Sequence, residues 1–290
     1  MQKPAIGTSL PLSPATPSHA AWQEQSFFAW SGLGRQANPL IQASLIPAQK
    51  VSAGTEQSTQ PVAQAGFESV YFVLQGEQEV RDSSAPEQWL SGTAGDVLWQ
   101  GTGRGVLTEK RIGSTLARQG GTLEAVNLWV NLPAAYKTSD PHHQVLKAAD
   151  IPVISLPDEA GTLRLIAGSF DGQTGPAETV TPVQCWDVSI SAGKAVKLPL
   201  HHRWYAQVLL LRGSLKIDFV NHLVTAPTLV ALDAAGDELC CQAKEDVRMI
   251  VLCSEPVDEP LVGRDELVFA SAAQLAEAEQ QLKDGGFGLL

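Results

Sequence analysis

The histidines are the residues of this sequence whose type and spacing first suggest metal chemistry. Two adjacent pairs occur, His142–His143 and His201–His202, and His19 and His222 stand alone. A transition metal is commonly held by imidazole nitrogens and carboxylates that converge on one point. Adjacent residues on a strand point to opposite faces, so each pair can direct at most one imidazole into a site. These histidines therefore favour hydrogen-bonded or exposed imidazoles, and a metal site that uses one of His201 and His202, just before the long strand of the second half, is the alternative.

Other short patterns that carry chemistry are missing. The sequence contains no Gly-x-Ser-x-Gly elbow and no Gly-rich phosphate loop. The stretch GTGRG (101–105) lacks the following helix that a dinucleotide site requires, so we interpret it as a turn. The cysteines stand in apolar segments without the spacing of a zinc or redox motif, and we expect buried reduced thiols at Cys185, Cys240, Cys241 and Cys253.

Composition limits the function classes. A chain of 290 residues with 44% hydrophobic content is long enough for two domains of ordinary size. The net charge is −11 and no run of Lys or Arg offers a phosphate-binding stripe, so we expect no direct nucleic-acid binding. No uninterrupted apolar stretch approaches the roughly 18 residues that span a bilayer. We therefore expect a soluble, cytoplasmic protein.

Two similar hairpins dominate the chain. SVYFVLQGEQEVRD (69–82) and YAQVLLLRGSLKIDF (205–219) each join an apolar strand to an alternating strand through a glycine turn. Downstream, LSGTAGDVLWQ (90–100) and LVALDAAGDELCCQ (229–242) share an Ala-Gly-Asp turn. The pattern predicts a repeated antiparallel β-barrel or jelly roll, with domains at 1–148 and 149–290; chance likeness of the two hairpins is the alternative.

Two segments have helical features. SDPHHQVLKAADIP (139–152) is compatible with a short turn that links the halves. Near the end, Ser271 is a suitable N-cap with Gln274 three residues later, and Gly285 is a suitable stop. We expect this C-terminal helix to pack back on a barrel.

Several longer strings then become recognisable in their order. GFESVYFVLQGE, NLWVNLPAAYK, RLIAGSFDGQTGP and the terminal DGGFG resemble the pirin family, and the resemblance extends from about Trp22 to Gly288. It implies an all-β bicupin, with two cupin jelly rolls, a short C-terminal helix and a C-terminal tail that returns to the first cupin.

The resemblance also implies where a metal would lie. Pirins hold iron or another divalent transition metal in the first cupin through three histidines and one glutamate. Here the corresponding strings are VAQAGFES and GRGVLTEK, which place Val62, Gln64 and Thr108 at the histidine positions and Lys110 at the glutamate position. Valine has no donor atom, and an ammonium repels a dication. We therefore predict a degenerate site without metal or other cofactor.

A cavity that lost its metal is either filled by side chains or open to a small ligand. Candidate wall residues beside the altered positions are Phe67, Glu68, Trp99 and Trp129, although each aromatic residue is equally compatible with ordinary core. Lys110 offers a charge for an anionic ligand, or for Glu68 or Glu109. Glu109 is shifted by one residue from Lys110, so its side chain is expected to point out of the barrel.

Two function classes remain open. The first is a non-enzymatic binding or regulatory protein with an unknown protein partner or small-molecule ligand. The second is a metal-dependent oxygenase like the quercetin 2,3-dioxygenases of the family, which requires a bound transition metal. The substituted ligand positions favour the first class.

Overall fold

The chain folds into two compact units. The computed structural model describes residues 6–11, 13, 22–30, 38–55, 58–217, 223–232 and 234–290. The N-terminal unit comprises Ser13–Ala148 and Val257–Leu290, and the C-terminal unit comprises Met1–Leu12 and Ala149–Pro256. The predicted domains were 1–148 and 149–290, but the two ends of the chain exchange units. The N-terminal segment joins the C-terminal unit because residues 6–11 pair with a strand at 228–232. The tail joins the N-terminal unit because it contacts Ala65.

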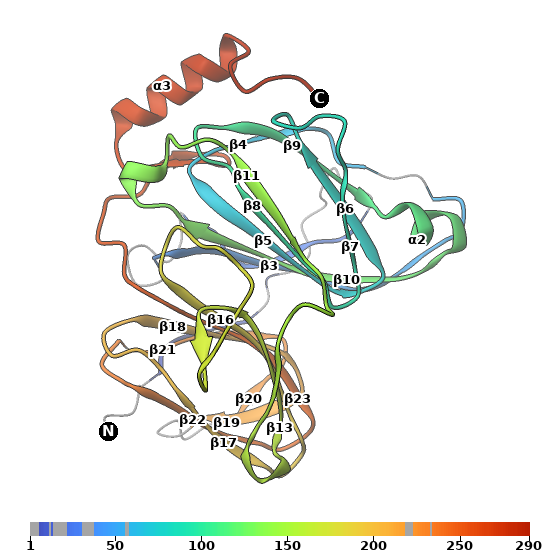
Figure 1. Cartoon of the computed structure of the whole chain (residues 1–290), viewed down its shortest axis with the longest axis vertical. Helices are drawn as coiled ribbons and strands as arrows, with labels where there is room; N and C mark the ends of the chain where they lie inside the picture. The colour runs from blue at the N-terminus through green and yellow to red at the C-terminus, as the bar shows by residue number, and fades with distance from the viewer. Residues whose placement is uncertain are drawn as a thin grey trace. The chain divides into compact units, whose positions relative to one another are not determined.

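The N-terminal unit contains two antiparallel sheets (Figure 1). The six-stranded sheet has the order β11-β8-β5-β10-β3-β2, with β2 (Gln25–Phe28), β3 (Leu40–Val51), β5 (Phe67–Gln75), β8 (Val97–Gly101), β10 (Gly121–Asn131) and β11 (His142–Leu146). The four-stranded sheet has the order β4-β9-β6-β7, with β4 (Val62–Gln64), β6 (Glu77–Asp82), β7 (Leu90–Thr93) and β9 (Val106–Ile112).

The C-terminal unit repeats this two-sheet plan. Its seven-stranded sheet has the order β1-β21-β18-β23-β16-β13-β12, with β1 (Ile6–Pro11), β12 (Val153–Ser155), β13 (Gly161–Ala167), β16 (Val183–Ile190), β18 (Tyr205–Arg212), β21 (Thr228–Leu232) and β23 (Val247–Ser254). Its four-stranded sheet has the order β17-β22-β19-β20, with β17 (Ala195–Pro199), β19 (Ser214–Ile217), β20 (Val224–Thr225) and β22 (Glu238–Ala243). A small hairpin adds β14 (Ser169–Phe170) and β15 (Gln173–Thr174).

The predicted hairpin repeat is confirmed. In each unit the first strand of the hairpin, β5 or β18, lies inside the large sheet and the second, β6 or β19, lies in the four-stranded sheet. The glycines at the turns, Gly76 and Gly213, both have positive φ. The predicted Ala-Gly-Asp equivalence is wrong, because the first such turn leads into β8 of the large sheet and the second into β22 of the small sheet.

Helices contribute little to the described chain. The C-terminal helix α3 (Ala272–Lys283) begins as predicted, since the Ser271 hydroxyl accepts a hydrogen bond from the Gln274 amide. The segment 139–152 contains strand β11 rather than only a turn. A short helix, α2 (Ser114–Gln119), and two 3₁₀ turns, Ala134–Tyr136 and Pro157–Glu159, complete the set. No helix in the described ranges is long and apolar enough to cross a membrane.

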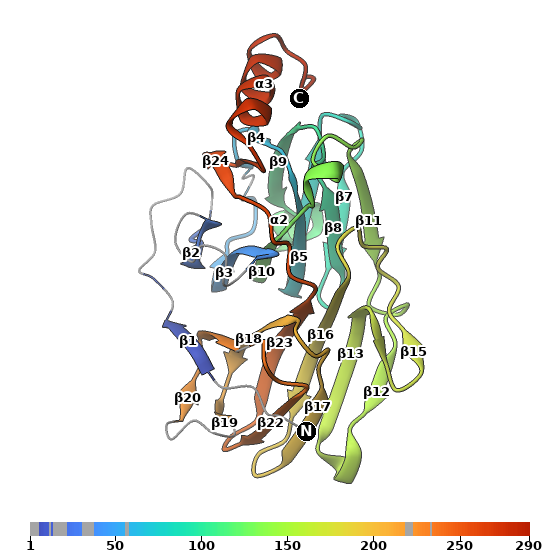
Figure 2. The ribbon, with the colours of Figure 1, turned by 90° about the vertical axis from the view of Figure 1, so that its left-hand side faces the viewer.

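The C-terminal tail, residues 257–290, closes one end of the N-terminal unit. It forms a hairpin of β24 (Val262–Arg264) and β25 (Leu267–Phe269), and Leu267 bridges to Ala65 beside β4. Helix α3 then lies by β4 and β9 (Figure 2). Apolar side chains of the tail, including Leu275 and Phe287, bury Ala65 and the adjoining residues of these strands. This packing explains why the tail belongs to the N-terminal unit.

Candidate ligand site in the N-terminal unit

The four substituted ligand positions lie on two paired strands of the N-terminal unit. Val62 and Gln64 are on β4 and Thr108 and Lys110 on β9, with Val62 directly opposite Thr108. Gln64 and Thr108 are buried, whereas Val62 is 39% exposed. The structure therefore brings three polar side chains together at the place where the resemblance implies a metal.

Gln64 and Thr108 are each hydrogen-bonded to a residue that the sequence did not indicate. The Gln64 amide nitrogen donates to Glu266 of the C-terminal tail at 2.6 Å. The Gln100 amide nitrogen donates to the Thr108 hydroxyl at 3.3 Å and to the Asp82 carboxylate at 2.6 Å. The tail and strands β6 and β8 thus complete a site that begins on β4 and β9.

Lys110 lies inside the same cluster. Its Nζ is 5.3 Å from the centre of the Tyr71 ring. Burial lowers the pKa of Lys110, but electrostatic attraction to Glu24, to the Tyr71 hydroxyl and to Glu266 raises it above its ordinary value. Lys110 is therefore an ammonium at neutral pH.

The acidic partners of Lys110 respond to the same environment. Burial raises the pKa of the Glu266 carboxyl, while Lys110 and the hydrogen bond from Gln64 oppose that shift. Burial also raises the pKa of Tyr71, with opposition from Lys110 and Ser69. With its pKa raised, Tyr71 is a neutral phenol at neutral pH, and it lies beside the positive charge of Lys110.

These residues do not fit a transition metal. Val62 has no donor atom, and the protonated Lys110 would repel a dication at the position where pirins have a carboxylate. Throughout the described part of the chain, no group of three or more His, Cys, Asp or Glu side chains is arranged to hold a metal. The donor set instead suits a ligand that carries hydroxyl groups and negative charge.

Several buried polar atoms around Lys110 have no hydrogen-bond partner in the protein. They are the Gln64 carbonyl, the Gln100 carbonyl and both amide atoms of Gln78. The Tyr71 hydroxyl has Ser69 as a polar neighbour but no hydrogen bond of normal geometry. A buried polar group left unpaired costs about 1–3 kcal/mol, so such atoms are expected to be satisfied by water or ligand.

The four predicted wall residues divide between the two faces of the six-stranded sheet. Phe67 and Trp129 stack with their ring centres 4.1 Å apart, on the face that also carries Tyr71. Glu68 and Trp99 are also buried, but they lie on the opposite face of the sheet. Tyr71 and Gln100 point toward Lys110, and Glu68 and Trp99 are an odd number of residues from them along their strands, so both point away from Lys110. Only the Phe67–Trp129 pair remains a candidate wall of this site.

The remaining charged candidates also lie away from Lys110. Glu109 points outward and its carboxylate pairs with Arg81 at 2.7 Å, as the alternation predicted. His142 is 3.6 Å from Glu68, and His201 packs against Trp204 in the C-terminal unit. His19 and His222 lie outside the described residues.

Lys137 is a fully buried lysine, and it was predicted only as part of the string NLWVNLPAAYK. Its Nζ donates to the Gly66 carbonyl at 2.8 Å, the Asn131 side chain at 2.6 Å and the Val268 carbonyl at 2.9 Å. Burial lowers its pKa, and the charge of Glu259 opposes that shift. Lys137 therefore ties the end of β10 and the residue before β5 to β25 of the tail hairpin, whose turn carries Glu266.

Several residues that face the substituted ligand positions were not predicted from the sequence, because they lie on elements other than β4 and β9. One signal was present for β6, where Gln78 and Asp82 alternate onto the same face as Val80 and thus point inward. No local signal indicates Glu24 or Glu266, because both reach the site from segments far away in sequence.

Known proteins resemble this chain over most of its length. Residues 185–288 match the family described as the pirin C-terminal cupin domain. A Pseudomonas aeruginosa protein named "Putative quercetin 2,3-dioxygenase PA2418" is 36% identical over 264 residues, which cover 91% of each chain. Human Pirin is 27% identical over 221 residues, covering 73% of this chain and 72% of the human protein. The crystal structure of quercetin 2,3-dioxygenase from Acinetobacter baumannii superposes with a TM-score of 0.94 at 28% identity, covering 99% of both chains.

The paired two-sheet units, together with these matches, define a bicupin, and the predicted all-β fold class is confirmed. Within the cupins, the chain belongs to the pirin family. Its relatives include proteins named quercetin 2,3-dioxygenase.

Proposed function

We propose that the interior of the N-terminal unit binds a small polyphenolic ligand of the flavonol class, and that Lys110 does there what a metal does in other pirins. The observation that carries the proposal is the protonated Lys110 beside Tyr71, surrounded by buried amide atoms without protein partners. The ligand class is suggested by relatives that are named for quercetin.

The proposed chemistry follows from the charges of the site. A phenolic hydroxyl that loses its proton is stabilised by a nearby ammonium in a buried environment. Gln78 supplies an amide donor and acceptor, and Glu266 can accept a hydrogen bond from a second hydroxyl. The stacked Phe67 and Trp129, both buried on the sheet face that carries Tyr71, form the apolar side of the site.

A second candidate is metal-dependent quercetin 2,3-dioxygenase activity. It is favoured by the names of similar proteins, above all the 36% identical relative and the structure at a TM-score of 0.94. It would require a set of metal ligands other than Val62, Gln64, Thr108 and Lys110.

Titration with quercetin separates the two candidates. Metal-stripped protein is titrated anaerobically and followed by quercetin absorbance. We expect saturable binding, and we expect Lys110→Met to weaken it about tenfold or more, equal to about 1.4 kcal/mol. Lys50→Met is the matched control, because Lys50 is exposed on β3, and it is expected to bind as the unaltered protein does.

Aerobic turnover with and without Fe(II) or Ni(II) completes the test. Equal quercetin affinity in stripped and metal-treated protein, without metal-stimulated oxygen consumption, supports the metal-free site. Oxygen consumption that depends on added metal and on quercetin would overturn it in favour of the dioxygenase.

A further inference from the structure

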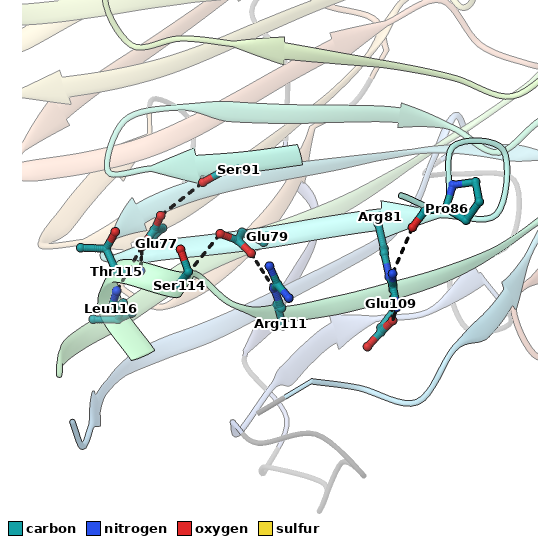
Figure 3. A network of polar contacts seen from close by, with 10 residues as sticks. All are labelled: Glu77, Glu79, Arg81, Pro86, Ser91, Glu109, Arg111, Ser114, Thr115 and Leu116. Atoms are coloured by element: carbon teal, nitrogen blue, oxygen red, sulfur yellow. Dashed lines mark hydrogen bonds and ion pairs between the residues drawn. The ribbon is translucent and has the colours of Figure 1, made fainter. Parts of the chain in front are cut away.

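The outer face of the four-stranded sheet carries a second concentration of charge. On β6 and β9, Gln78, Asp82, Thr108 and Lys110 point inward, so Glu79, Arg81, Glu109 and Arg111 at the alternate positions point outward. These outward residues form two cross-strand ion pairs, Glu79–Arg111 at 2.5 Å and Arg81–Glu109 at 2.7 Å (Figure 3). The same two strands therefore bear the interior site on one face and a charged surface on the other.

This surface is hollowed. A depression of about 740 Å³ is lined by Arg81, Trp89, Glu109, Arg111, Ser114 and Arg118, among others. Its volume falls within the range of about 300–1,000 Å³ that is typical of small-molecule sites. The guanidinium carbons of Arg111 and Arg81 lie 3.8 and 4.5 Å from the centre of the Trp89 ring. Trp89 and the apolar side chains of Ile112 and Ala117 give the hollow an aromatic and apolar component beside its cations.

The charges that line the hollow leave an excess of cation. Three guanidinium groups, Arg81, Arg111 and Arg118, line the hollow together with one carboxylate, Glu109, in a chain whose net charge is −11. Glu79, which pairs with Arg111, is not among the lining residues. Glu79 is shared, because it also accepts from the Ser114 amide at 3.2 Å. Glu77 is used by the amides of Thr115 and Leu116, as Figure 3 shows.

Donors are therefore available for a ligand. Among the described residues, Arg111 donates to Glu79 through its Nε alone, so its terminal nitrogens remain for another acceptor. Arg118 is exposed and makes no ion pair within the described ranges. A guanidinium pair beside an indole suits an anion that carries a flat ring, since the fork binds the carboxylate and the ring packs on apolar surface.

We propose that this hollow is a binding site for a small aromatic carboxylate, separate from the interior site. It uses Arg111 and Arg118 to hold the carboxylate and Trp89 to contact the ring. The proposal does not depend on the function of the interior site, because Arg111 points to the face of β9 opposite to Lys110, and Trp89 and Arg118 line the hollow with it.

The probe is 2-naphthoate, titrated calorimetrically into the metal-stripped full chain, with neutral 2-naphthalenemethanol as the uncharged comparison. We expect one saturable site for 2-naphthoate and at least about tenfold weaker binding of the neutral probe. Arg118→Gln is expected to weaken 2-naphthoate about three- to tenfold, and Arg111→Gln more strongly. Because Arg111 also pairs with the buried Glu79, the exposed Arg118 keeps the test valid if Arg111→Gln folds poorly.

Two further variants locate the binding. Arg104→Gln is the matched control, because Arg104 is an exposed arginine paired with Asp140 away from the hollow, and it is expected to change nothing. Lys110→Met is expected to bind 2-naphthoate normally. Equal binding of both probes, unchanged binding in Arg118→Gln, or loss of binding in Lys110→Met would each overturn the proposal, the last by assigning the ligand to the interior site.

Discussion

The two units share one fold but fill it differently. In the C-terminal unit, the inward residues of β17, β19 and β22 are all apolar or thiol side chains, namely Val196, Leu198, Leu215, Ile217, Leu239, Cys241 and Ala243. In the N-terminal unit, the matching strands β4, β6 and β9 direct Gln64, Gln78, Asp82, Thr108 and Lys110 inward. In both units the four-stranded sheet packs on the larger sheet. Among the described residues of these small-sheet strands, inward polar side chains are found in the N-terminal unit, whereas those of the C-terminal unit are apolar or thiol.

The comparison shows that the cupin sheet pair does not require a polar interior for folding. Burying polar and charged groups costs free energy unless they are paired, and an apolar core avoids that cost. The unpaired amide atoms of Gln78 and the cation of Lys110 thus distinguish the interior of the N-terminal unit, where we propose the ligand site, from the apolar interior of the C-terminal unit. The C-terminal unit serves here as a built-in reference for a filled interior.

Placing a lysine in the apolar interior gives the largest effect. Ala243→Lys puts an ammonium among the apolar side chains of the C-terminal unit, where no acidic side chain belongs to the core cluster. We expect a loss of about 3–5 kcal/mol in the free energy of unfolding. The measurement is urea denaturation followed by circular dichroism.

The matched control for that substitution is Gln242→Lys, one residue earlier on β22 and directed to the opposite face. It is expected to stay within about 0.5 kcal/mol of the unaltered protein. If Ala243→Lys and Gln242→Lys had equal free energies of unfolding, the interior of the C-terminal unit would tolerate a charge. The two units would then no longer differ in their need for an apolar interior.

Removing the buried lysine that anchors the tail has the next largest effect. Lys137→Met removes the ammonium that donates to three oxygens, on Gly66, Asn131 and Val268. We expect a loss of about 3 kcal/mol, measured by urea denaturation, and earlier proteolysis between β25 and the rest of the N-terminal unit. Stability like that of Lys50→Met would mean that these three hydrogen bonds do not hold the tail.

The smallest effect is a pH dependence at Glu266. Burial raises the pKa of this carboxyl above its ordinary value of 4.5, so the folded state binds a proton more tightly than the unfolded state. The contribution of Glu266 to stability is therefore full below pH 4.5 and is lost as the pH rises through the folded pKa. Glu266→Gln keeps an acceptor for Gln64 but cannot ionise.

We therefore expect the urea midpoint of Glu266→Gln, relative to the unaltered protein, to be higher at about pH 8 than at about pH 4. Glu277→Gln, an exposed position on α3, is the control and should show no such change. A relative midpoint that falls between the two pH values would mean that Lys110 outweighs burial at Glu266.

The sequence predicted the fold more completely than the site. The hairpin repeat, the inward and outward alternation around Glu109 and the cap at Ser271 depend on local spacing, and each could be predicted. The Ala-Gly-Asp match failed, because a turn motif specifies a bend in the chain and not the sheet that the next strand enters.

The site was only half predictable for a related reason. The resemblance indicated Gln64, Thr108 and Lys110, which lie on strands that are continuous in sequence with recognisable strings. Glu24 and Glu266 join them only after the chain ends fold back, and the spacing of residues carries no information about such long-range contacts. For Glu68 and Trp99, position along the strand was predicted but the face was not.

The central claim is that the N-terminal site works without a metal, and metal stoichiometry tests it most directly. Protein purified without a histidine tag is incubated anaerobically with Fe(II) or Ni(II), desalted and measured by elemental analysis. The account predicts far less than one metal per chain, with no change in Lys110→Met. About one tightly held metal per chain would contradict it, and would require a set of ligands in place of Val62, Gln64, Thr108 and Lys110.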